Sequence, residues 1–316
     1  MKKRLRLKKK VWFFIAIIIF IPIFIVAGIK IKAKYDYQKT YEYRFLQKDY
    51  TKKEYELISK YFEESSYEEI LAKDKDETLL KILANKNFIK DNLERYLDYS
   101  SKNNLTIDDI ILDVNLNLDY KFYENITKTD TEKDTLMLVN KYNALSSDYE
   151  PNDLVVISQK YSWGEGKQIR KEVYDAFLNM WDDANNEGIY LIINLGYRSY
   201  ADQEAIYNRL MKLKNRKYAD GISARPGHSE HQTGLALDIF EKNNSSTETF
   251  KDSIAYTWLK NNAYKYGFIL RYTEENESIT GFNAEDWHYR YVGKEVAKKI
   301  YESNITFEEY YTYNVK

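Results

Sequence analysis

The sequence predicts an α+β fold in which a small antiparallel sheet is flanked by helices. Residues 235–239 alternate between apolar side chains and a face that carries Asp238, which is the period of a strand. Residues 287–291 alternate in the same way and place His288 on one face of a second strand. Apolar residues at helical spacing over 168–186 predict an amphipathic helix that covers the sheet.

The N-terminus predicts a membrane anchor. Residues 2–10 contain seven Lys or Arg, and residues 11–29 are uncharged and strongly apolar, long enough for a helix across a bilayer of about 30 Å. We expect a basic cytoplasmic tail at 1–10, an uncleaved transmembrane helix at 11–29, and the remaining chain on the cell-wall side. A cleaved signal peptide is the alternative, but no A-x-A site follows the run.

Composition narrows the classes of function. The formal charge of the whole chain is −1, and it becomes −8 without the basic tail. No basic stripe with interleaved aromatics is present, so nucleic-acid binding is not expected. The chain contains no cysteine, which excludes a disulfide framework and a thiol nucleophile.

A small helical module is predicted between the anchor and the C-terminal domain, over residues 34–114. Thr51 with Glu54 forms the pattern of a capping box, and several short helical segments follow. We interpret this module as a spacer or as an accessory unit that faces the wall; a glycan-binding module is the alternative. The C-terminal domain is expected over 115–316, with residues 119–157 as an extended arm entering it.

The order of elements in the C-terminal domain follows from start and stop signals. Residues 189–195 predict a buried strand that leads into Arg198, and Ser199 with Asp202 caps the helix that follows. The remaining expectations are a helix at 253–266, a strand at 268–272, a flexible loop at 273–283 and a last helix at 294–303.

Two of these strands carry the candidate metal ligands. All three histidines fall within residues 228–288, in two short stretches. His231, Asp238 and His288 form a three-ligand set of the kind that holds a catalytic zinc with its fourth position open to water. Glu285, three residues before His288, is the candidate base for that water. The alternative is that each histidine is a hydrogen-bonded structural residue and Asp238 an ordinary paired carboxylate.

Arg198 is a candidate for presenting its side chain in a cleft, and a surface ion-pair partner is the alternative. It leaves a strand just before a capped helix, and a guanidinium can offer two parallel donors to a carbonyl or carboxylate. Gln203, on the first turn of that helix, is placed to orient Arg198; a solvated glutamine is the alternative.

These residues resemble the signature of zinc D-alanyl-D-alanine carboxypeptidases of the VanY type, a family with close L,D-carboxypeptidase relatives. The resemblance rests on Ser229-x-His231-x-x-Gly234-x-Ala236-x-Asp238, on Glu285-x-Trp287-His288, and on Gly196-Tyr197-Arg198-Ser199 upstream. It covers roughly residues 141–301. One departure is Asp286, where many relatives have proline, which affects the turn that aims Glu285.

The resemblance implies a hedgehog/DD-peptidase-like zinc domain. It implies zinc on His231, Asp238 and His288, with Glu285 as general base and Arg198 at the scissile carbonyl. It also implies that Ser229 binds the terminal carboxylate of the substrate; a turn hydroxyl that caps the backbone is the alternative. We expect Tyr197 and Gln203 to contribute to substrate binding. His228 lies outside the ligand set, and we expect it beside the ligands or at the rim.

We therefore expect a membrane-anchored, extracytoplasmic zinc carboxypeptidase that removes the C-terminal D-alanine from peptidoglycan stem peptides. An L,D-carboxypeptidase acting on tetrapeptide stems and a non-catalytic zinc-binding wall module remain as alternatives.

Overall fold

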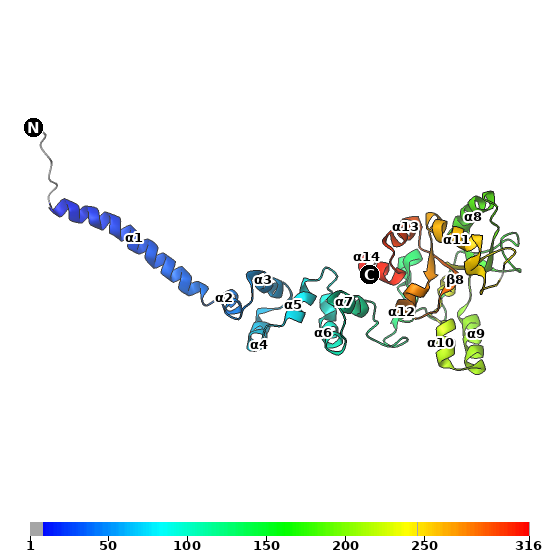
Figure 1. The fold of residues 1–316 in the computed structure, drawn as a ribbon, viewed down its shortest axis with the longest axis horizontal. Helices are drawn as coiled ribbons and strands as arrows, with labels where there is room; N and C mark the ends of the chain where they lie inside the picture. Colours follow the sequence, from blue (N-terminus) through cyan, green and yellow to red (C-terminus); the bar gives the residue numbers. More distant parts are fainter. Residues whose placement is uncertain (1–8, 245, 316) are drawn as a thin grey trace, which may run out of the picture. The chain divides into compact units, whose positions relative to one another are not determined.

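A computed structural model of the chain describes the backbone of residues 9–244 and 246–315, and the side chains of these residues from 18 onward except 19 (Figure 1). The chain divides into two compact units, Met1–Ile111 and Leu112–Lys316. The boundaries predicted for the individual domains stay predictions.

The first unit is helical. Its core includes Phe45, Ile58 and Tyr67, and the predicted capping box is formed: the backbone N–H of Thr51 donates to Glu54 Oε2 at 2.6 Å, and that of Glu54 to Thr51 Oγ1 at 3.3 Å. The helices are α1 Lys9–Tyr37, α2 Tyr41–Leu46, α3 Lys52–Tyr61, α4 Tyr67–Ala72, α5 Glu77–Ala84 and α6 Leu93–Lys102, with 3-10 turns at Glu64–Ser66 and Lys90–Asn92. Helix α7 (Ile107–Asn115) runs into the second unit.

The N-terminal segment bears on the predicted anchor. Within the described part of the chain, no helix combines the length and the apolar character needed to cross a membrane. Residues 1–8 of the predicted basic tail, and the side chains of residues 9–17 and 19, lie outside the described residues. The anchor therefore stays a prediction.

A four-stranded antiparallel sheet forms the centre of the second unit, which confirms the predicted α+β class. Its order is β5 (Leu191–Leu195), β6 (Ala236–Glu241), β8 (Glu285–Tyr291) and β7 (Phe268–Tyr272). Two short pairs lie outside this sheet: β1 (Thr127–Lys128) with β2 (Asn143–Ala144), and β3 (Leu154–Val156) with β4 (Gln168–Arg170).

Helices cover one face of this sheet. Phe177 of α8 (Lys171–Asn186) and Leu259 of α11 (Ile254–Asn262) are buried in one cluster with Leu237 of β6 and Tyr289 of β8. Figure 1 shows α8 and α11 together, at the opposite end of the unit from α9 (Tyr200–Leu213) and α10 (Arg216–Ile222). The alternation of β6 and β8 therefore sends their apolar residues to these helices and leaves Asp238 and His288 on the other face.

Three sequence expectations differ from the structure. The helix expected from residue 168 begins at Lys171, because Gln168–Arg170 pairs as strand β4. In place of the loop expected at 273–283, the structure has a 3-10 turn at Glu274–Asn276 followed by the short helix α12 (Glu277–Thr280). The arm expected at 119–157 contains a 3-10 segment at Thr131–Leu136. The cause at 273–283 is local capping: Asn276 Oδ1 accepts the Thr273 backbone N–H at 2.9 Å.

The C-terminus adds an element that was not predicted. Helix α13 (Lys294–Ser303) forms where expected, and α14 (Phe307–Asn314) follows it. Helix α14 begins with a capping box between Thr306 and Glu309. Its Phe307 is fully buried in a cluster with Ile269 and Val292, so α14 is part of the domain.

Candidate metal centre

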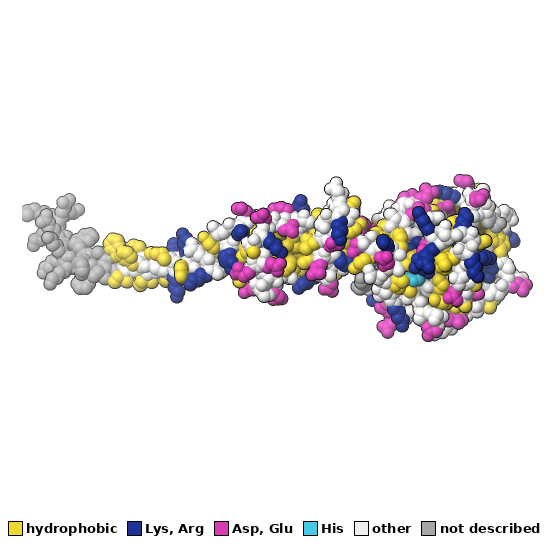
Figure 2. Space-filling model, turned by 90° about the horizontal axis from the view of Figure 1, so that it is seen from below, with side chains coloured by type: hydrophobic (Ala, Val, Ile, Leu, Met, Phe, Trp, Pro, Cys, Tyr) yellow, Lys and Arg dark blue, Asp and Glu magenta, His cyan; other side chains and the backbone are white. Residues whose placement is uncertain are grey.

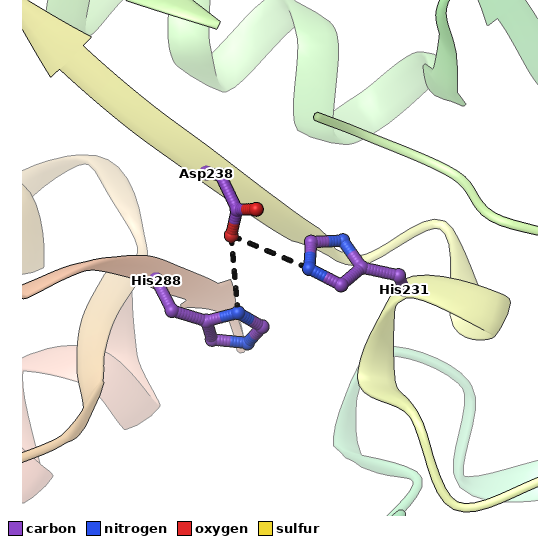
Figure 3. Close-up of side chains that lie close together, drawn as sticks. All are labelled: His231, Asp238 and His288. Atoms are coloured by element: carbon purple, nitrogen blue, oxygen red, sulfur yellow. Dashed lines mark ion pairs between the residues drawn. The ribbon is translucent and has the colours of Figure 1, made fainter. Parts of the chain in front are cut away.

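The structure brings the three predicted metal ligands together. His231 lies on a 3-10 turn (Glu230–Thr233), Asp238 on β6 and His288 on β8. Asp238 Oδ1 lies 3.3 Å from His231 Nε2 and 3.2 Å from His288 Nδ1, and one ligand atom from each residue falls within 4.8 Å of the others (Figure 3). All three side chains are buried, although the space-filling view shows histidine atoms at the surface beside basic side chains (Figure 2).

Hydrogen bonds on the far side of each ring select the nitrogen that faces the centre. His231 Nδ1 lies 2.8 Å from the carbonyl oxygen of Gly196, which can only accept, so Nδ1 carries the proton and Nε2 keeps its lone pair. His288 Nε2 lies 3.2 Å from a carboxylate oxygen of Glu230 and donates to it, which leaves Nδ1 for a metal. Both rings are therefore oriented as metal ligands.

A turn and a strand register place these residues. Gly234 ends the turn that carries His231 with a φ of 64°, a left-handed conformation that favours glycine. Strand β6 then begins two residues later, and its Asp238 pairs in register with His288 of β8.

The electrostatics of the centre fit a cation. Burial would raise the pKa of Asp238, but the two histidines outweigh it and hold that pKa far below its usual range. Burial alone would lower the pKa of His288, yet the neighbouring carboxylates of Asp238 and Glu230 raise it to about 9. Asp238 Oδ1 and His288 Nδ1 are buried without a hydrogen-bond partner among the described residues. Two nitrogens and one carboxylate oxygen with unused lone pairs are a donor set that suits zinc.

Glu285 lies beside this set at the start of β8. Its Oε2 is 3.7 Å from His288 Nδ1, too far for a hydrogen bond. Burial raises the pKa of Glu285 to about 7, against the lowering effect of His288. A carboxyl group whose pKa lies near neutral is suited to accept and return a proton.

Arg198 and Ser229 lie next to each other. The Arg198 guanidinium donates to Ser229 Oγ at 3.3 Å, and its backbone N–H donates to the His231 carbonyl at 3.1 Å. Arg198 Nε is buried without a hydrogen-bond partner among the residues described. A guanidinium with an unused donor beside a hydroxyl can bind a carboxylate or a carbonyl oxygen.

The other predicted residues have different surroundings. Gln203 is fully buried, and its side-chain amide donates to Ser223 Oγ at 3.0 Å and to the Ala224 carbonyl at 2.6 Å. Gln203 is therefore neither solvated nor bonded to Arg198, which differs from both hypotheses. Tyr197 is half-buried, and its backbone N–H donates to the Gln168 carbonyl at 2.7 Å.

His228 is a buried structural residue. Its Nδ1 donates to the Asn140 carbonyl at 2.7 Å, and its ring meets the Tyr123 ring edge-on with centroids 5.0 Å apart. It is 5 % exposed, which excludes the predicted rim position. Burial lowers the pKa of His228, so the ring stays neutral at neutral pH.

Sequence reasoning missed Glu230, whose carboxylate accepts a hydrogen bond from Nε2 of His288. It also missed Arg271 and Arg290, which lie on β7 and β8 and donate to Glu230 Oε1 at 2.9 and 3.1 Å. The available signal was arginine within strands whose other residues are buried, because such a charge requires a buried partner.

Comparison with known proteins identifies the family. Residues 166–294 match the family "VanY: D-alanyl-D-alanine carboxypeptidase". YodJ of Bacillus subtilis is 42% identical over 205 residues, which cover 61% of this chain and 75% of YodJ. The bifunctional D-Ala-D-Ala dipeptidase and D-Ala-D-Ala carboxypeptidase VanXYC of Enterococcus gallinarum is 32% identical over 183 residues, covering 57% of this chain and 94% of VanXYC.

A solved structure agrees with these relatives. The LdcB LD-carboxypeptidase, whose structure addresses peptidoglycan recognition, is 42% identical with a TM-score of 0.57 over 60% of this chain and 92% of LdcB. The matched residues 166–294 contain Arg198, Glu285 and the three ligands. The chain therefore belongs to the VanY family of D-alanyl-D-alanine carboxypeptidases.

Proposed function

We propose that this chain removes the C-terminal D-alanine from peptidoglycan stem peptides, outside the membrane to which its N-terminus anchors it. The observation that carries the proposal is a partly buried carboxyl, Glu285, directly beside a set of three metal ligands. A ligand set alone would serve a structural site, whereas a nearby group with a pKa of about 7 serves acid–base chemistry.

The metal ligands and Glu285 have different roles in the proposed reaction. A zinc ion held by His231, Asp238 and His288 supplies Lewis-acid polarisation and lowers the pKa of water. Glu285 accepts the proton of the attacking water and returns it to the amine of the departing D-alanine. Glu285 is suited to both transfers because its own pKa lies near neutral pH.

Arg198 and Ser229 are proposed to bind the substrate. Together they present a guanidinium and a hydroxyl 3.3 Å apart, which suits a carbonyl oxygen that gains negative charge and a terminal carboxylate next to it. Gln203 and Tyr197 are proposed to support this side of the site, Tyr197 as the residue that precedes Arg198. Gln203 contributes by holding residues 223 and 224, and its Oε1 is buried without a hydrogen-bond partner among the described residues.

A second activity is favoured by one specific observation. LdcB, at 42% identity, is an LD-carboxypeptidase, and such an enzyme cleaves between an L- and a D-residue. The same catalytic groups serve both reactions, so the stereochemistry is set by the pocket that holds the residue before the cleaved bond.

The membrane anchor is supported by the composition of the N-terminal helix. Residues 11–29 are uncharged and follow seven basic residues. Where side chains of α1 are described, Ile18 is 69% exposed and Phe24 72% exposed, which is apolar surface that a lipid phase would cover. Protease added to intact protoplasts is expected to digest the C-terminal unit and to leave a membrane-bound fragment containing residues 11–29. A mature chain that begins after Ala33 would mean a cleaved signal peptide instead.

Mass spectrometry of digested muropeptides tests the reaction. The full-length, zinc-loaded chain is incubated separately with muropeptides that carry pentapeptide stems ending in D-Ala-D-Ala and with those that carry tetrapeptide stems. We expect loss of one alanine from the pentapeptides. Loss of alanine only from the tetrapeptides would identify an L,D-carboxypeptidase, and loss from neither would refute both assignments.

A further inference from the structure

Glu230 is a buried carboxylate that does not face the metal centre directly. Its side chain is 0% exposed, and both oxygens are engaged: Oε2 accepts from His288 Nε2 at 3.2 Å, and Oε1 accepts from Arg271 and Arg290 at 2.9 and 3.1 Å. Fully buried acids are rare unless they are paired. Glu230 is therefore a fixed point between one metal ligand and two guanidiniums.

A second carboxylate, on the last helix, completes this cluster. Arg271 donates to Glu230 through Nε and to Glu308 Oε1 through a terminal nitrogen at 2.6 Å. Glu308 lies on α14, and its Oε1 also accepts from the Asn140 amide at 3.2 Å. The side chains of Arg271, Arg290 and Glu308 are at most 4% exposed. Two acids and two arginines thus balance in charge away from water.

Arg290 and Asn140 tie the cluster to the arm. Arg290 donates to the carbonyl oxygens of Thr135 and Met137 at 3.0 and 2.8 Å. Asn140 connects to Glu308 through its amide and to His228 through its carbonyl. The cluster is therefore held by the arm, the sheet and α14 at once, which leaves Glu230 little freedom to move.

We propose that Glu230 is a positioning residue for the zinc ligand His288, and that Glu308 on α14 extends this support to the C-terminus. The proposal rests on the function proposed above only in that His288 binds the metal. Acceptance of the Nε2–H by Glu230 fixes the tautomer and the ring plane of His288, which aims the Nδ1 lone pair at Asp238 and His231. Loss of either acid leaves a surplus positive charge close to the metal.

Zinc affinity, measured by competition with a chromophoric chelator on full-length chains, tests the proposal. We expect Glu230→Gln to weaken zinc binding about 10- to 100-fold, the range typical when a partner of a metal ligand is lost. Glu308→Gln acts through Arg271, so we expect a smaller loss of roughly three- to tenfold, below that range.

Glu309→Gln is the matched control. Glu309 is the neighbour of Glu308 on the same helix, and its carboxylate caps Thr306 at 2.7 Å rather than joining the cluster. We expect its zinc affinity to stay within about twofold of the wild type, since glutamine also completes a capping box.

Two results would overturn the proposal. One is a folded Glu230→Gln chain that binds zinc as tightly as the wild type, even if its melting temperature is lower, because that pattern means a purely structural role. The other applies if Glu230→Gln does not fold: the zinc affinity of Glu308→Gln is then the test, and an affinity equal to that of the wild type refutes the proposal. A wild-type chain that binds no zinc would instead refute the metal site itself.

Discussion

Asp238 and His288 lie opposite each other in the register of β6 and β8, with Asp238 Oδ1 3.2 Å from His288 Nδ1. Side chains alternate between faces along a strand, so a register shift of one residue would move either ligand to the apolar face. The pairing of two strands therefore builds two thirds of the ligand set before any metal binds.

Removing either of these ligands should remove the metal. We expect Asp238→Ala and His288→Ala to purify with little zinc, measured by atomic absorption per mole of folded chain, because two ligands do not hold zinc tightly. Asp286→Ala is the control: it removes a carboxylate on the same strand that is outside the ligand set, and zinc should stay stoichiometric. Full zinc content in Asp238→Ala would remove that residue from the set.

Arg198→Ala should lose turnover while keeping zinc. If the guanidinium stabilises the negative charge that develops on the substrate oxygen, kcat/KM of the alanine variant falls by on the order of two to three decades. Arg198→Lys should recover only part of the loss, because an ammonium cannot reproduce two parallel donors. Steady-state kinetics on zinc-loaded chains measure both values, and full recovery by lysine would contradict the assigned role.

Gly234→Ala should destabilise the turn between the ligands. An alanine there would have a φ of 64°, and its Cβ would lie 2.9 Å from Arg170 Cγ and 3.1 Å from Leu154 Cδ2. We expect a loss in the free energy of unfolding of about 1–3 kcal/mol, from backbone strain and overpacking together.

Gly188→Ala is the matched control for this variant. Gly188 has a φ of 80°, but a Cβ there would meet nothing within 4 Å, so only the backbone strain applies. Denaturant titrations should therefore show a smaller loss for Gly188→Ala than for Gly234→Ala. Equal losses would mean that the close approach at Gly234 does not matter.

Stability should fall in mild acid partly because of His228. Burial lowers the pKa of His228 in the folded chain, whereas the unfolded chain keeps a pKa of about 6.5. The unfolded state therefore binds a proton first as the pH falls. The contribution of His228 to the free energy of unfolding is complete above a pH of about 6.5, and it is lost as the pH falls from there through the pKa of the folded chain. His228→Asn retains a donor toward the Asn140 carbonyl but cannot titrate. We expect its melting temperature to fall less than that of the wild type between neutral pH and mild acid, and parallel curves would contradict this account.

The sequence predicted the metal ligands better than the buried charged residues that hold them in place. Periods of two around Asp238 and His288 reveal both strands, because each strand has one apolar face. The partners of Glu230 could not be found in this way, because they come from β7 and β8, and Glu308 of α14 joins them only through Arg271. No local pattern reports which of these elements become neighbours. The 3-10 turn at Glu274–Asn276 was hidden for a different reason: it begins with a capping box between Thr273 and Asn276, in a segment without a long apolar stripe.

The most direct test of the catalytic account is a zinc titration of the metal-free full-length chain, followed by release of D-alanine from a pentapeptide stem. We expect the rate in the wild type to rise linearly to one zinc per chain. Glu285→Gln should bind zinc with the same stoichiometry and turn over about two to four decades more slowly, because glutamine cannot accept the proton. Near wild-type turnover by zinc-loaded Glu285→Gln, or activity in the metal-free chain, would contradict the account.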